Sequence, residues 1–117
     1  MTQDIKKIEA IFKDEQLTEV KDALEAAGFI SMTIIPVRGR GRQGGISLEW
    51  RATTYRVDLL HKILLSIVVK AEDVSTVVEI ITAICQNDVT GGGGKIFISP
   101  IEQVIRMRGG ETGLDAI

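Results

Sequence analysis

A chain of 117 residues has room for one domain with a modest core, and its 44% hydrophobic and 26% charged residues are typical of a globular protein. A net charge of −2 and a pI of 5.4 argue against a general binder of nucleic acids or of membrane surfaces. The single cysteine, Cys85, excludes an internal disulfide, and no apolar stretch approaches the ~18 residues of a spanning helix. We therefore expect one cytoplasmic domain over residues 1–117, with no membrane insertion.

The first third of the chain predicts a strand, a helix and a second strand. Residues 6–12 alternate between apolar and polar positions, which is a strand pattern. Residues 15–27 place apolar side chains three and four apart and are followed by Gly28, so they predict an amphipathic helix with a glycine stop. Residues 31–37 predict the second strand, and Pro36 near its end favours an edge position.

The rest of the chain predicts a strand, a helix and a last strand. Residues 62–69 are apolar on both faces, and residues 73–85 carry apolar side chains at helical spacing. The Gly-rich segment 87–94 ends that helix. Residues 95–99 and 102–108 predict a last strand with an interruption at Pro100, and the Gly-rich tail 109–117 is expected to be loose.

The order β-α-β-β-α-β predicts an α+β, ferredoxin-like fold, with one antiparallel sheet and both helices on one face. Two helices cover only one face of the sheet, yet the strand at 62–69 is apolar on both. Proteins seldom leave a large apolar patch in contact with water, so something else must cover the second face. Self-association is the simplest answer, although the pattern does not set the number of copies.

The segment 38–61 between two strands is far too long for a tight hairpin loop of about 2–5 residues. It begins with the glycine- and arginine-rich R-G-R-G-R-Q-G-G and later holds Trp50 and Tyr55, the only Trp and the only Tyr of the chain. Residues of these types are enriched where proteins touch partners. We interpret this segment as the part of the molecule that makes contacts.

Three glycine-rich or cationic groups suggest an anion site. They are G-R-G-R-Q at 39–43, T-G-G-G-G-K at 90–95 and R-M-R at 106–108. Strand periodicity predicts that Arg106 and Arg108 share one face. Each group also has a simpler explanation. The first could be a solvated loop, the second a hinge, and the third a pair of solvated charges. If the groups converge between subunits, charge-assisted hydrogen bonds would let them hold a triphosphate.

No catalytic constellation accompanies these groups. His61 has no partner serine, cysteine or metal-ligand set near it in the sequence, and Cys85 falls on the apolar face of a helix, where a core position is expected. The protein is therefore expected to bind rather than to catalyse.

Several separated motifs, taken together, resemble the PII nitrogen-regulatory signal transducers. They are K-K-I-E-A-I at 6–11, G-R-G-R-Q-G-G at 39–45, Y-R-V-D at 55–58, G-K-I-F at 94–97 and V-I-R-M-R-G-G-E at 104–111. The resemblance implies a homotrimer that binds ATP or ADP competitively in three clefts and, with ATP and magnesium, also binds 2-oxoglutarate.

The resemblance also implies roles for single residues. Those implied to contact the nucleotide are Thr33, Gly39, Arg42, Gln43, Val68, Gly92, Gly93, Gly94, Lys95, Arg106 and Arg108. Those implied to contact 2-oxoglutarate are Gly41, Arg42, Gln43, Gly44, Lys62 and Lys13. Gln43 would also complete the magnesium shell between the phosphates and 2-oxoglutarate.

The segment 38–61 corresponds to the T-loop of that family, and we use this name for it below. The resemblance implies that the T-loop changes conformation with ligand state and docks on a nitrogen-metabolism enzyme, a regulator or an ammonium transporter, which would recruit the protein to the membrane. Arg51 and Trp50 are the expected partner contacts. Tyr55 matches a tyrosine that some members have uridylylated, and Thr53 stands where others carry a phosphorylatable serine. Ala52 and Thr54 depart from the usual surroundings, which weighs against modification of Tyr55.

Other departures concern the nucleotide site. Gly93 replaces an acidic residue in the segment 87–94, the expected nucleotide loop, and Ser66 stands where many members carry a glutamate. These changes would alter recognition of the adenine and ribose without removing phosphate binding.

Three alternatives remain at the level of the sequence. The first is a PII-like nucleotide-binding sensor that answers to another small molecule, such as bicarbonate or a cyclic nucleotide. The second is a single-stranded RNA binder on the same fold, although the candidate strands offer only Phe12 and Phe97 as stacking aromatics. The third is a small acylphosphatase-like hydrolase, which the missing catalytic constellation disfavours.

Overall fold

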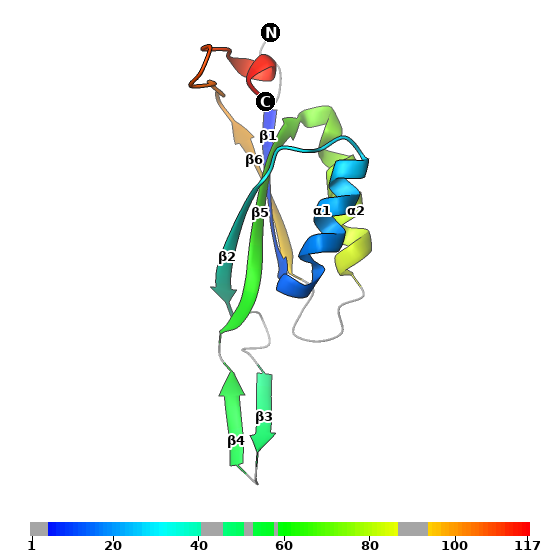
Figure 1. Cartoon of the computed structure of the whole chain (residues 1–117), viewed down its shortest axis with the longest axis vertical. Coiled ribbons are helices and arrows are strands. Elements are labelled where there is room, and N and C mark those ends of the chain that lie inside the picture. The colour runs from blue at the N-terminus through cyan, green and yellow to red at the C-terminus, as the bar shows by residue number, and fades with distance from the viewer. Residues whose placement is uncertain (1–4, 41–45, 51–52, 58, 87–93) are drawn as a thin grey trace.

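The computed structural model describes residues 5–40, 46–50, 53–57, 59–86 and 94–117 (Figure 1). Its first half runs from β1 (Ile5–Lys13) through a short 3-10 turn into α1 (Leu17–Ala26) and then β2 (Thr33–Gly39). Gly28 ends α1 with φ of +97°, and Phe29 donates its backbone N–H to the Leu24 carbonyl at 2.9 Å. A glycine in this left-handed conformation is a common helix stop, as the sequence predicted.

The second half contains β5 (Leu60–Lys70), a 3-10 turn, α2 (Val74–Cys85) and β6 (Lys95–Ile101). The four long strands form one sheet in the order β2-β5-β1-β6, and every neighbouring pair is antiparallel. Both helices lie on one face of this sheet (Figure 1). The predicted ferredoxin-like α+β fold is therefore confirmed, and β2, which contains Pro36, is an edge strand.

The core lies between the sheet and the two helices. Alternate residues of β1 and β5 point toward it, which follows from the period of two in the sequence. The buried core cluster consists of Ile8, Ala10, Phe12, Val20, Leu24, Ile63, Leu65, Ile67, Val69, Val77, Ile81 and Cys85.

The opposite face of the sheet carries no helix, and we call it the helix-free face (Figure 1). Strand pairing sets Ile35 beside Leu64, and Leu64 beside Ile11. Phe97 lies opposite Glu9 on the same face and is 51% exposed. The predicted need for a cover on this face thus has a structural basis, while the cover itself stays a prediction.

The T-loop is more regular than the sequence predicts. β2 continues to Gly39 and β5 begins at Leu60. Between them, β3 (Ile46–Trp50) and β4 (Thr53–Val57) pair as a separate two-stranded antiparallel sheet. Both strands are rich in β-branched and aromatic residues, which favour extended backbone. The interpretation of the whole segment as a loop overlooked this hairpin.

The C-terminal segment also differs from the prediction. β6 ends at Ile101, so the expected continuation of the last strand through 102–108 is wrong. Instead Ile105 forms an isolated bridge with Thr112, and Gly113–Ala116 form a 3-10 helix. The tail 109–117, expected to be loose, therefore folds back as a short hairpin, because glycines with positive φ at 109, 110 and 113 allow its turns.

Candidate functional site

Lys62 and Gly39 lie together at the end of the helix-free face that adjoins the T-loop. Lys62 pairs with Lys13 on β1 and with Val37 on β2, and only 6% of it is exposed. A Cβ added to Gly39 would lie 3.4 Å from Lys62 Cδ, an ordinary contact distance, so Gly39 lies next to the lysine stem. The fold therefore brings three predicted ligand residues, Lys13, Gly39 and Lys62, to one corner of the sheet.

Lys95 is the first residue of β6 and is exposed on the same face, directly opposite Ile11. The residue before it explains its position. Gly94 has φ of +87°, and a Cβ there would collide with the backbone oxygen of Ile11. Only glycine lets β6 begin this close to β1, so the last glycine of the Gly run has a structural reason as well as a proposed role in binding.

Thr33 and Val68 lie on the helix-free face near the other end of the sheet. Thr33 is exposed and pairs with Ser66, whereas Val68 is partly buried and pairs with Lys7. Thr33 belongs to one edge strand and Lys95 to the other. Three strand spacings separate these edges, a width of about 14 Å. One chain thus presents Thr33 and Lys95, both implied nucleotide contacts, on one face but at opposite edges.

Arg106 and Arg108 do not share a strand face, which corrects the sequence prediction. Both lie in the C-terminal hairpin beyond the end of β6, whereas Lys95 begins that strand (Figure 1). The length of β6 alone, about 20 Å, separates them from Lys95. The reason is the turn at 107–109, which replaces the extended backbone that period-two geometry requires. The three cations cannot meet on one rim of a single chain.

Hydrogen bonds define the C-terminal hairpin around Arg106. Arg106 donates its backbone N–H to the Glu111 carbonyl at 2.9 Å, and Gly110 donates to the Arg106 carbonyl at 3.2 Å. The side chains of Arg106 and Glu111 form an ion pair, with Nε 4.0 Å from Oε2. For Arg108, by contrast, the described part of the chain shows no ion pair. The sequence singled out the arginines but not Glu111.

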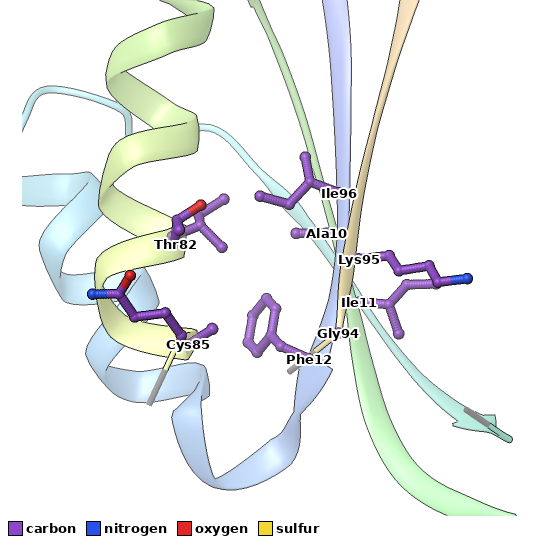
Figure 2. Close-up of a pocket in the computed structure, with 10 residues that line it drawn as sticks. Ala10, Ile11, Phe12, Thr82, Cys85, Gly94, Lys95 and Ile96 are labelled. Atoms are coloured by element: carbon purple, nitrogen blue, oxygen red, sulfur yellow. The ribbon is translucent and has the colours of Figure 1, made fainter. Parts of the chain in front are cut away.

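A cavity of about 240 Å³ lies on the helix side of the sheet, between the end of α2 and strands β1 and β6 (Figure 2). Figure 2 shows Phe12, Ala10, Ile96, Thr82 and Cys85 around it, while the Lys95 side chain points away. The cavity is therefore separate from the helix-free face. Cys85 is buried beside this cavity, which confirms the core position predicted for it. A second cavity, of about 270 Å³, lies where the α1–β2 connection meets the end of β5.

Several predicted site residues lie outside the described residues. They are Gly41, Arg42, Gln43, Gly44, Arg51, Gly92 and Gly93. Trp50, Thr53 and Tyr55 lie in the β3–β4 hairpin, so the predicted partner contact and modification sites share one element.

The described residues also bear on metal and membrane binding. Among residues 5–40, 59–86 and 94–117, no three His, Cys, Asp or Glu side chains group as metal ligands. Over the described part of the chain, no helix has the length and apolar character needed to cross a bilayer.

Comparison with known proteins identifies the family. The sequence model described as Nitrogen regulatory protein P-II matches residues 5–111. The chain belongs to the P-II family. The chain is 53% identical over 115 residues to Nitrogen regulatory protein P-II 2 of Methanothermobacter thermautotrophicus, with 97% of each chain covered. It is 47% identical over 113 residues to Nitrogen regulatory protein P-II of Cereibacter sphaeroides, with 97% of this chain and 100% of the relative covered.

The P-II match confirms the resemblance drawn from the motifs. It spans both β6 and the hairpin of Arg106 and Arg108, so the family assignment includes the separated cationic groups. P-II proteins are regulatory signal transducers rather than enzymes, which agrees with the binding role expected from the sequence.

Proposed function

We propose that this protein is a P-II-type signal transducer that senses ATP, ADP and 2-oxoglutarate and acts through its T-loop. Its target would be a nitrogen-metabolism enzyme, a regulator or an ammonium transporter. Membership of the P-II family supports the role in nitrogen regulation. The ligands and the target are the part that we infer.

One observation carries the ligand proposal, namely the separation of Lys95 from Arg106 and Arg108 along β6. Within one chain, the predicted phosphate ligands Lys95, Arg106 and Arg108 are therefore divided between the two ends of β6. Association of copies through the helix-free face would bring the Lys95 end of one chain near the C-terminal hairpin of another. A homotrimer with a ligand cleft between each pair of neighbours would cover the exposed apolar face. It would also bring cations from two chains to the same cleft.

We propose for the individual residues the roles that the resemblance implies. Lys95, Arg106 and Arg108 would hold the phosphates, together with Arg42 and the backbone of 92–94. Thr33, Gly39 and Val68 would lie near the adenosine. Lys62 and Lys13 would face the distal carboxylate of 2-oxoglutarate, and their pairing beside the T-loop supports this role.

Magnesium would join these ligands. Gln43, which the resemblance assigns to the ion, lies outside the described residues. An amide oxygen beside phosphate and carboxylate oxygens is a donor set that magnesium accepts. The bound ion would neutralise part of the phosphate charge.

Ligand binding would act on the T-loop because β2 and β5, which carry Gly39 and Lys62, lead directly into it. ADP lacks the γ-phosphate, so it would not build the same magnesium and 2-oxoglutarate site. A difference in affinity of about 1–3 kcal/mol between T-loop conformations is enough to change partner binding.

Calorimetry tests the proposal. Titration with magnesium and ATP, with and without 2-oxoglutarate, should show that each ligand tightens the binding of the other. Nucleotide binding without this linkage would contradict the sensor of 2-oxoglutarate and favour a P-II-like sensor of bicarbonate or a cyclic nucleotide. A pull-down from cell extract with ADP, and again with ATP plus 2-oxoglutarate, should retain different targets.

A further inference from the structure

Glu111 contacts Arg106, one of the proposed phosphate ligands, and neither the motifs nor the P-II match gives Glu111 a role. Its carboxylate forms the ion pair with Arg106, at 4.0 Å between Oε2 and Nε. Both side chains are about half exposed, at 53% and 43%, so the pair lies where a ligand can reach it.

The hairpin fixes this carboxylate beside the arginine. The backbone hydrogen bond from Arg106 to Glu111 and the bridge between Ile105 and Thr112 set the two residues opposite each other. Gly109 adjoins the carboxylate, since a Cβ at that position would lie 2.5 Å from Glu111 Oε1. The turn is thus built so that an acid lies against a proposed phosphate ligand.

Two effects of the carboxylate on a bound polyphosphate oppose each other. It can hold the guanidinium in place, which favours binding, or repel the phosphates, which disfavours it. A half-exposed ion pair contributes little to positioning, and the backbone hydrogen bonds already hold the hairpin. The repulsion between the carboxylate and the ligand acts on every phosphate charge, and at moderate salt it falls off over about 8–10 Å. We therefore expect this repulsion to outweigh the positioning of the guanidinium.

We propose that Glu111 is a built-in counter-ion that weakens polyphosphate binding in proportion to the charge of the ligand, and so sets the discrimination between ATP and ADP. This inference rests on the proposed function, because it takes Arg106 as a phosphate ligand. ATP carries one more negative charge than ADP, so Glu111 penalises ATP more. Glu111 thereby keeps the bound nucleotide exchangeable. It also reduces the difference by which the affinity for ATP would otherwise exceed the affinity for ADP.

The test compares Glu111→Gln with the wild-type protein by calorimetry with ATP, ADP and AMP, without magnesium. Glutamine keeps the shape and removes the charge. The affinity for ATP should rise about two- to fivefold at low salt, less for ADP and least for AMP. The gain should vanish at about 1 M salt, where the screening length is about 3 Å.

Two further variants separate the charge effect from structure. Glu111→Asp keeps the charge and should bind like the wild type. Glu102→Gln removes an exposed acid of the same segment that forms no ion pair within the described residues, so it should change the affinity less. Circular dichroism checks that all variants fold alike.

Each other outcome is decisive. Weaker ATP binding by Glu111→Gln would mean that the carboxylate positions Arg106, and a gain that is equal for all nucleotides or persists at about 1 M salt would mean a structural effect. Either result overturns the counter-ion. If the wild type binds no nucleotide at all, the proposed function fails with it; if the wild type binds and Glu111→Gln matches it, the counter-ion alone fails.

Discussion

At the scale of single residues, Gly94 shows how little space separates β6 from β1. Gly94→Ala should lower the free energy of unfolding by about 2–4 kcal/mol, because the new Cβ would collide with the Ile11 carbonyl and φ is already +87°. Gly28→Ala is the matched control, since Gly28 has φ of +97° but nothing within 4 Å of an added Cβ. It should cost about 1–2 kcal/mol. Equal losses in urea denaturation would contradict the close approach.

Lys95 tests the proposed phosphate contact at the same scale. Lys95→Ala should weaken ATP binding about ten- to a hundredfold, because a charge-assisted hydrogen bond to phosphate is lost. The free energy of unfolding of Lys95→Ala should barely differ from that of the wild type, since the Lys95 side chain is exposed. Lys21→Ala removes a half-exposed lysine of α1, and calorimetry should show unchanged nucleotide affinity for it. Similar affinities for the two variants would remove Lys95 from the site.

At the scale of elements, α2 is held by the apolar stripe that the sequence predicted. Ile81 lies in its middle, is 2% exposed and belongs to the core cluster. Ile81→Ala should therefore cost about 2–5 kcal/mol in urea denaturation. Ile30→Ala makes the same chemical change at a residue that is 72% exposed and should stay within about 0.5 kcal/mol of the wild type. A small loss at Ile81 would mean that α2 packs loosely on the sheet.

The elements that were predicted correctly and incorrectly differ in one respect. β1, α1, β5 and α2 carry long periodic apolar patterns, and their existence and type followed from those patterns. The β3–β4 hairpin and the C-terminal hairpin are short, and backbone pairing defines each of them. Their geometry depends on turns and on backbone pairing, which a hydrophobic pattern does not report. Arg106 and Arg108 were misplaced for this reason.

At the scale of the whole molecule, two neighbouring residues of β6 test how copies associate. Phe97 and Ile98 are almost equally exposed, at 51% and 50%, but point to opposite faces of the sheet. Phe97→Glu places a charge on the helix-free face and should convert the proposed trimer into monomers by analytical ultracentrifugation. It should also abolish nucleotide binding, because the proposed cleft needs two copies. Ile98→Glu should remain a trimer, and dissociation by that variant instead would assign the interface to the other face.

The sequence by itself determined the order of the main elements, the core, the apolar second face and the residue types of the proposed ligand site, because periodicity and motifs are local properties of the chain. Only the tertiary structure decided that Lys13, Gly39 and Lys62 meet at one corner, that Lys95 lies a strand length from Arg106, and that Glu111 lies against that arginine. Such distances depend on strand order, on register and on where turns reverse the chain. These features arise when separate segments pack together, and no single segment encodes them.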